Sequence, residues 1–283
     1  METAFAELPL AVFTTLAPVA AGAFVAWAVA LCTGSVAEGA GQKRFERMTI
    51  LPFLVACAGF VASALHTANP AHGLDAIAGL GRSPLTNEIA AGGLFMVVAL
   101  VYVIAVCAGK LEGKRKALAL VTGVLGVVFV LFVGGAYLVP TIPSWNTALL
   151  PIEILGFALT GGAALLGLMQ ALSVKDAAPS KALAGLSIAG GAIAVVASAT
   201  HLGLVAGMGN AVSSGAALVA TAAPYAIAGL VLIAASAVVS ARGFAKGMTA
   251  GAAGAAVACA VAGVFLMRLS FYALYLSVGV TLL

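Results

Sequence analysis

The chain has 283 residues, of which 63% are hydrophobic and 8% are charged, and its mean hydropathy is +1.19. Because a soluble domain carries about 25% charged residues, this composition excludes a soluble protein and indicates an integral membrane protein. The formal net charge of +4 therefore indicates interaction with anionic lipid and relates to the orientation in the membrane. It does not indicate binding to nucleic acid.

Long uncharged stretches predict the membrane segments. Seven runs contain no Asp, Glu, Lys or Arg: 8–37, 48–74, 89–109, 117–152, 154–174, 182–241 and 247–267. About 20 apolar residues, at 1.5 Å each, cross the roughly 30 Å hydrocarbon layer as a helix, and the runs lack the alternation of barrel strands. The run 182–241 is long enough for two crossings, with a turn, GMGNAVSSG, at 207–215.

We therefore predict an all-α integral membrane protein that forms one polytopic domain over residues 1–283. The predicted bundle has eight transmembrane helices, approximately at 8–32, 48–68, 86–109, 117–139, 147–172, 182–206, 219–241 and 249–275. The start of the sequence, METAFAE, has no positive charge ahead of the first apolar run, so it does not resemble a cleaved signal peptide.

The basic residues predict the orientation of this bundle. Eleven of the 13 Lys and Arg residues lie in alternate connections: Lys43, Arg44, Arg47, Lys110, Lys114, Arg115, Lys116, Lys175, Lys181, Arg242 and Lys246. The connections on the other face, 69–85, 140–146 and 207–218, contain Arg82 as their only basic residue. The positive-inside rule then places the basic connections in the cytoplasm and both termini on the outer, non-cytoplasmic side.

Buried polar residues are predicted to converge near the outer boundary. Counting along the outward-running helices places four residues roughly 27 to 30 Å from the inner boundary: His66, Tyr137, His201 and Arg268. Glu88 opens the helix 86–109 from the outer side, and Glu153 lies about 9 Å below the outer start of the next inward helix. Ionisable residues in a membrane segment cost at least about 2.5 to 3.5 kcal/mol each, so they usually face a cavity or a partner.

Such a set fits the oxidation of a quinol, which releases two protons and two electrons. A histidine and a carboxylate in a dry pocket can both accept protons near neutral pH, which makes His66 and Glu88 a suitable pair. Four single cysteines without a CxxC spacing, Cys32, Cys57, Cys107 and Cys259, argue against an iron-sulfur cluster or zinc site in this protein. The electron acceptor is therefore expected on another subunit.

Each of these residues also has a plainer interpretation. Glu88 can serve only as a first-turn acid that complements the helix dipole, and Arg268 can extend to the lipid headgroups. The remaining candidates have structural or solvent-facing alternatives, as packing histidines, interfacial aromatic residues or loop residues: His66, His72, Asp75, Trp145, His201, Tyr272 and Tyr275.

Two other functions stay open. A haem b-containing quinol oxidase subunit would need His66 and His201 as axial ligands, and their similar depth permits this. A secondary transporter would have a midplane site and helices broken at matching positions in two halves. The polar residues gather at one surface and the two halves show no repeat, which disfavours the transporter.

Four motifs resemble the anchor subunit family of dimethyl sulfoxide reductase (DmsC). They are HTANP at 66–70, SPLTNEI at 83–89, VPTIPSW at 139–145 and RLSFYALYLSVGV at 268–280. The resemblance implies a membrane anchor of an anaerobic respiratory molybdoenzyme complex, which binds and oxidises menaquinol near the outer leaflet. It implies no haem or metal in this protein, [4Fe-4S] clusters in a four-cluster iron-sulfur partner subunit, and molybdopterin in a catalytic partner subunit.

The resemblance also implies a location and a site. The location is the bacterial cytoplasmic (inner) membrane, with the partner subunits on the outer face and the segment 69–85 as a docking surface. The family's quinol-site histidine falls on His66 and its glutamate on Glu88. The full expected quinol-binding set is His66, Asn69, Asn87, Glu88, Tyr137, Trp145, Glu153, Arg268 and Tyr272.

The sequence departs from the family pattern at two places. Thr67 and Ala68 replace the usual leucine and glycine after the histidine. Val264 stands where the family often has an acid four residues before the arginine, which leaves Glu153 as the expected substitute partner of Arg268. The terminal substrate is not encoded in this sequence, because the catalytic subunit selects it.

Overall fold

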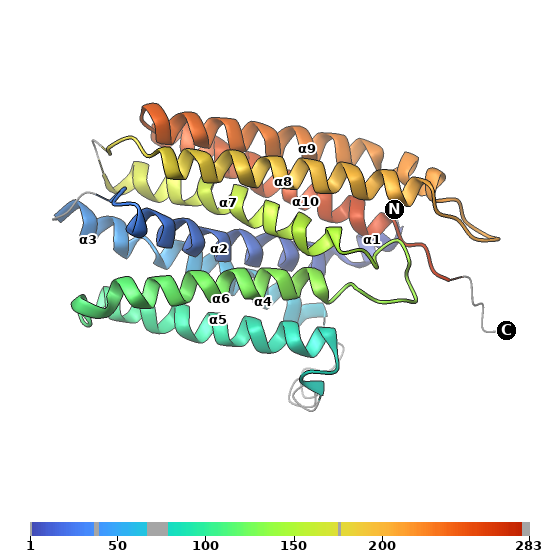
Figure 1. Ribbon diagram of the computed structural model, residues 1–283, viewed down its shortest axis with the longest axis horizontal. Coiled ribbons are helices and arrows are strands. Elements are labelled where there is room, and N and C mark those ends of the chain that lie inside the picture. The colour runs from blue at the N-terminus through green and yellow to red at the C-terminus, as the bar shows by residue number, and fades with distance from the viewer. Residues whose placement is uncertain (1, 37–39, 67–78, 175–176, 279–283) are drawn as a thin grey trace.

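The computed structural model describes residues 2–36, 40–66, 79–174 and 177–278, and this part of the protein is almost entirely helical (Figure 1). Its elements are α1 (Glu2–Ala6), α2 (Leu8–Cys32), α3 (Ala40–Arg47), α4 (Ile50–His66), α5 (Pro84–Cys107), η2 (Glu112–Lys114), α6 (Arg115–Gly135), α7 (Leu149–Ser173), α8 (Lys181–Ala206), α9 (Gly215–Lys246) and α10 (Ala250–Ala273). The predicted residues Asn69, His72 and Asp75 lie outside the described residues.

The prediction of an all-α bundle is confirmed, because eight helices are long and apolar enough to cross a membrane. Two predicted helices have wrong bounds, and the one predicted at 219–241 also begins earlier, at Gly215. The helix predicted at 117–139 ends at Gly135, where two glycines and the prolines that follow replace the helix with tight turns. The helix predicted at 219–241 continues to Lys246, since Arg and Lys are good helix formers once the backbone leaves the apolar layer.

Two helices, α2 and α7, form the centre of the bundle. In each, 72% of the most apolar stretch is buried, against 22 to 44% in the other six spans. Their backbones touch: a Cβ on Gly22 would lie 1.8 Å from the Ala158 carbonyl oxygen, and one on Gly162 would lie 2.0 Å from the Gly22 carbonyl carbon. Small residues permit this approach, as in other membrane helix pairs.

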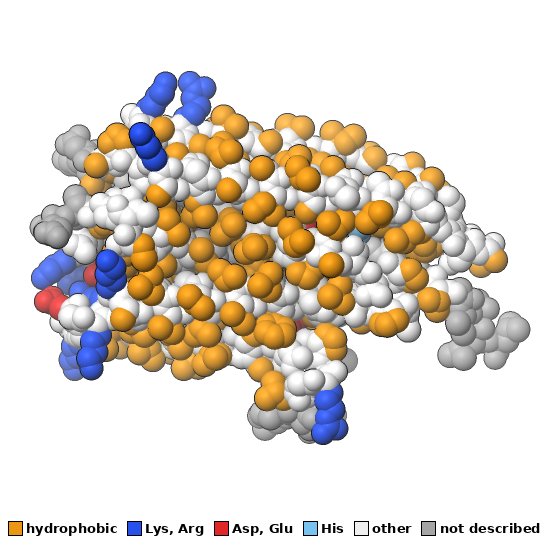
Figure 2. All heavy atoms as spheres, viewed as in Figure 1, with side chains coloured by type: hydrophobic (Ala, Val, Ile, Leu, Met, Phe, Trp, Pro, Cys, Tyr) orange, Lys and Arg blue, Asp and Glu red, His pale blue; other side chains and the backbone are white. Residues whose placement is uncertain are grey.

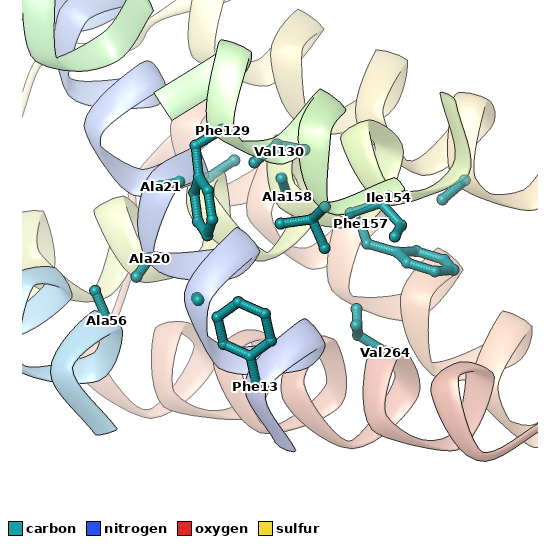
Figure 3. Packing of buried hydrophobic residues seen from close by; sticks show 14 of the residues in the cluster. Phe13, Ala20, Ala21, Ala56, Phe129, Val130, Ile154, Phe157, Ala158 and Val264 are labelled. Carbon is teal, nitrogen blue, oxygen red and sulfur yellow. The ribbon is translucent and has the colours of Figure 1, made fainter. Parts of the chain in front are cut away.

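Around this contact the core is filled by aromatic and aliphatic side chains. Figure 3 shows Phe13, Phe129, Ile154 and Phe157 packed among the alanines of α2 and α7. The surface is apolar along the length of the bundle (Figure 2), with large exposed side chains such as Leu65. This is the pattern of helices whose outer faces contact lipid.

The two ends of the bundle differ in charge. Most of the Lys and Arg side chains visible in Figure 2 lie at the end that carries α3, η2 and the α9–α10 connection, which we call the basic end. The opposite end carries α1, the start of α5 and the end of α10, and we call it the α1 end (Figure 1). The bundle thus separates the predicted site from the basic connections.

A buried polar network closes the basic end. Trp27 Nε1 donates to the Tyr102 hydroxyl at 2.6 Å, and that hydroxyl donates to Glu46 Oε1 at 3.0 Å. Arg115 Nη1 donates to Glu46 Oε2 at 3.2 Å. The network joins α2, α3, α5 and α6, so it fixes the short helix α3, which the sequence interpretation had left as a connection.

The α2–α7 contact predicts a large effect of single methyl groups. Gly22→Ala and Gly162→Ala should each lower the free energy of unfolding by about 1 to 3 kcal/mol, because the added Cβ meets backbone that cannot move aside. Denaturant unfolding in mixed micelles measures this change. Gly93→Ala is the matched control, since nothing lies within 4 Å of its Cβ position, and an equal loss there would contradict the explanation.

The basic-end network makes a second prediction. Glu46→Gln leaves the Arg115 guanidinium, whose side chain is 10% exposed, without a charged partner inside the network. The free energy of unfolding should fall by about 3 to 5 kcal/mol. Glu112→Gln removes a carboxylate that also faces Arg115, at 3.9 Å, but is 61% exposed, so its effect should stay below about 1 kcal/mol. Similar losses in both variants would refute this account.

Candidate functional site

The α1 end contains a fully buried arginine, Arg268 on α10. Its Nε donates to Thr14 Oγ1 of α2 at 2.8 Å, and its Nη2 donates to the Tyr272 hydroxyl at 3.3 Å. Among the described residues its Nη1 has no hydrogen-bond partner. A buried charged donor without an acceptor is costly, so this atom marks a place where a ligand oxygen would be stabilised.

Aromatic rings surround the guanidinium. Its central carbon lies 4.2 Å from the ring centroid of Phe271, 5.0 Å from that of Tyr272 and 5.1 Å from that of Tyr137. Trp145 stacks on Phe271 with centroids 5.0 Å apart, and the hydroxyls of Tyr137 and Tyr272 are hydrogen-bonded to each other. Cation–π contacts compensate part of the lost hydration of the charge.

A tight turn carries Tyr137 and Trp145 into this cluster. Residues 139–145, VPTIPSW, follow α6 with two prolines that restrict the backbone. The segment after α10 holds the turn in place, because Leu276 N donates to Ser144 Oγ at 3.1 Å and Val278 N donates to Thr141 O at 3.1 Å. Burial raises the pKa of the Tyr137 phenol well above its ordinary value, so it stays protonated.

Glu88 on α5 faces the same cluster. It is buried, and it interacts electrostatically with both Arg268 and Tyr137. The helix begins at Pro84, with Ser83 as N-cap, so Glu88 lies beyond the first turn and the interpretation as a simple first-turn acid fails. Asn87 instead accepts a hydrogen bond from Gly81 N at 2.7 Å, which stabilises the turn before α5.

Glu153 and His201 form a second buried pair beside this cluster. His201 Nδ1 lies 3.2 Å from Glu153 Oε2, and His201 Nε2 lies 2.8 Å from the Ser144 carbonyl oxygen. The expectation that Glu153 replaces the missing acid as the direct partner of Arg268 is therefore wrong: its hydrogen bond goes to His201. The charge of Glu153 still acts on Arg268 at longer range.

The structure thus brings most of the predicted set together. Tyr137, Trp145, Arg268 and Tyr272 are in direct contact around Phe271, Glu88 is buried within electrostatic range of Arg268 and Tyr137, and Glu153 lies beside them. His66 is the last residue of α4, at the same end of the bundle. No group of three or more His, Cys, Asp or Glu able to hold a metal ion occurs within the described ranges.

The sequence interpretation missed two contributors and the hydrogen-bond partners of a third. Thr14 and Phe271 are ordinary residues of apolar helices, and no spacing signal marks them. His201 was considered only as a structural residue or a haem ligand, whereas both of its ring nitrogens are hydrogen-bonded. Its partner Glu153 lies 48 positions away in sequence, so only the packing of α7 against α8 shows the pair.

Comparison with known proteins agrees with these features. The family model of the DMSO reductase anchor subunit (DmsC) matches residues 1–274. The C subunit of the anaerobic dimethyl sulfoxide reductase of Escherichia coli strain K12 is 32% identical over 224 residues, 77% of each protein. The C subunit of the Haemophilus influenzae enzyme is 31% identical over 150 residues, 53% of each protein. On these matches, the protein belongs to the DMSO reductase anchor subunit (DmsC) family.

Proposed function

We propose that this protein is the quinol-oxidising membrane anchor of an anaerobic respiratory molybdoenzyme complex, and that menaquinol binds at the α1 end beside Arg268. The observation that carries the proposal is the Nη1 group of Arg268, buried and without an acceptor in the described part of the protein. A quinol hydroxyl or quinone carbonyl supplies such an acceptor. The surrounding rings of Phe271, Tyr137 and Tyr272 supply the apolar walls that a quinol ring needs.

The proposal assigns proton uptake to the residues around this position. Glu88 is a buried carboxyl group within electrostatic range of Arg268, and His66 ends the preceding helix, α4, at the same end of the bundle. When quinol is oxidised, its O–H bonds break, and these groups accept protons while they hold the ring. The two electrons go to the iron-sulfur subunit that the family implies, and from it to the molybdopterin subunit.

The charge asymmetry of the bundle supports an orientation for this reaction. By the positive-inside rule, the basic end lies in the cytoplasm and the α1 end faces outward. Menaquinol then enters from the outer leaflet of the bacterial inner membrane, and the partner subunits dock on the outer face. If protons are both released and consumed on that side, the reaction moves no net charge across the membrane.

The alternative functions have less support. A haem would need His201 as a ligand, but both ring nitrogens of His201 are already engaged, by Glu153 and by the Ser144 carbonyl. A transporter would need a site near the midplane, whereas the cluster around Arg268 lies at one end of the bundle.

Binding of a fluorescent quinol analogue tests the proposal. His66→Ala and Glu88→Gln should each weaken binding by about ten- to a hundredfold, because each loses a hydrogen bond to a polar ligand group. Quenching of the analogue by membranes carrying each variant measures the affinity. Glu112→Gln, an exposed acid at the basic end, is the control and should bind as the wild type does. Wild-type affinity in both site variants would exclude these roles.

Arg268→Lys tests the guanidinium itself. Lysine keeps the charge but loses the planar fork that places Nη1 toward the ligand, so the KM for quinol in the assembled complex should rise at least about tenfold. Arg242→Lys, the same change at an exposed position of α9, should leave KM unchanged. Thermal unfolding of both variants shows whether the bundle is intact. An unchanged KM in a folded Arg268→Lys complex would remove Arg268 from the site.

A further inference from the structure

A second group of buried polar atoms lies next to the proposed quinol site and is not used by it. The hydroxyls of Ser198 on α8 and Ser270 on α10 belong to residues that are each 1% exposed, and neither has a hydrogen-bond partner in the described parts of the protein. Both residues line one small cavity, of about 10 Å³, together with Glu153 and His201. Two unpaired hydroxyls and a hydrogen-bonded acid–base pair therefore share a single space.

This cavity fits one water molecule. A site of roughly 10 to 15 Å³ holds a water when two to four polar groups surround it, and the two serines with the Glu153–His201 pair meet that condition. Each hydroxyl would otherwise remain without the hydrogen bond that a buried polar group needs. A bound water supplies hydrogen bonds to both hydroxyls, so neither hydroxyl needs contact with bulk solvent.

The hydrogen-bond geometry of the pair fixes its proton content. The Ser144 carbonyl oxygen can only accept, so His201 Nε2 carries a hydrogen. His201 Nδ1 and Glu153 Oε2 lie 3.2 Å apart, and two lone pairs cannot face each other at that distance in a buried site. One proton is therefore shared between them, on the ring or on the carboxyl group.

We infer that the Glu153–His201 pair, with a water bound by Ser198 and Ser270, is a proton-transfer site that takes up one of the two protons released by quinol. This inference rests on the proposed function. A quinol O–H bond breaks, and its proton passes to the pair while the pair's shared proton passes to the bound water, which releases a proton toward the α1 end. The pair therefore keeps one proton throughout, and the electrons of the quinol go to the iron-sulfur clusters of the partner subunit.

The position of the pair suits this role. Phe271 joins the two clusters, since its ring lies under the Arg268 guanidinium and 6.1 Å from the His201 ring. On the other side, His201 Nε2 contacts the turn that contains Ser144, which leads toward the α1 end. The pair therefore contacts both the aromatic cluster at the proposed quinol position and the turn at the α1 end.

A positive charge also faces the pair. Arg268 acts electrostatically on both Glu153 and His201, so a second proton on the pair is disfavoured. The other titratable groups that interact with that guanidinium are Glu88 on α5 and the phenols of Tyr137 and Tyr272. The two phenols are hydrogen-bonded to each other.

Infrared spectroscopy of the anchor without quinol tests the pair independently of the proposed function. In the wild type, the carboxyl band of Glu153 should shift in D2O, because the pair shares an exchangeable proton. That band should vanish in Glu153→Gln, change its frequency in His201→Gln and shift in the Ser198→Ala, Ser270→Ala double variant. Ser240→Ala is the matched control, because its hydroxyl is also buried and unpartnered among the described residues but lies outside this cavity. A Glu153 band that does not shift in D2O would overturn the inference even if quinol is oxidised.

Turnover of the reconstituted complex supplies the second test. Glu153→Gln and His201→Gln should lower kcat about a hundredfold and alter its pH profile, as loss of acid–base transfer does, with quinol affinity within about twofold of the wild type. Glu153→Asp should restore part of the rate. The double serine variant should lose about tenfold, and Ser240→Ala nothing. Unchanged kcat, or a loss of affinity without a change of pH profile, would refute the transfer role.

Discussion

The backbone contact between α2 and α7 sets the heights of the polar residues in this protein. Both helices begin at the α1 end, and Gly22 and Gly162 hold them together. Thr14 lies eight residues before Gly22, and Glu153 lies nine residues before Gly162, so both reach about 12 to 14 Å from the contact. Thr14 then meets Arg268, and Glu153 meets His201. A shift of α2 along α7 would separate the two clusters.

The groups that surround the Arg268 guanidinium are unusual for a buried charge. Among the described residues its hydrogen bonds go to hydroxyl groups and its remaining neighbours are aromatic rings, while the acids Glu88 and Glu153 act on it through space. A direct carboxylate pair would consume the donors of the guanidinium. Because those donors are not all used, the charge stays available to a neutral, oxygen-bearing ring, which is the chemistry of a quinol.

Composition and charge predicted much of this fold. Uncharged runs located eight helices because the bilayer imposes both length and hydrophobicity, and α2 was predicted at its observed bounds of Leu8–Cys32. The same signal could not locate helix ends that depend on local geometry, as at Gly135, nor the short helix α3, which is held by the contact of Glu46 with Arg115. Hydropathy describes the lipid layer and says little about the headgroup region.

The candidate site was predicted in part. Depth along each helix placed Tyr137, His201 and Arg268 at one end, and the structure has them there. Depth alone cannot say which side of a helix faces which neighbour, so the pairing of Glu153 with His201 and the contact of Thr14 with Arg268 were out of reach. The roles of His66 and Glu88 in quinol binding stay predictions from the family motifs.

The hydrogen bond between Thr14 and Arg268 joins residues 254 positions apart, on the first and last membrane spans. The first span is synthesised early and the last span late, and the turn carrying Trp145 is held by late parts of the protein, including Phe271, Leu276 and Val278. The arginine cluster therefore cannot form on a partly inserted polypeptide. A polypeptide that lacks its last span therefore has no buried arginine cluster, and this end of the bundle is completed only when insertion has finished.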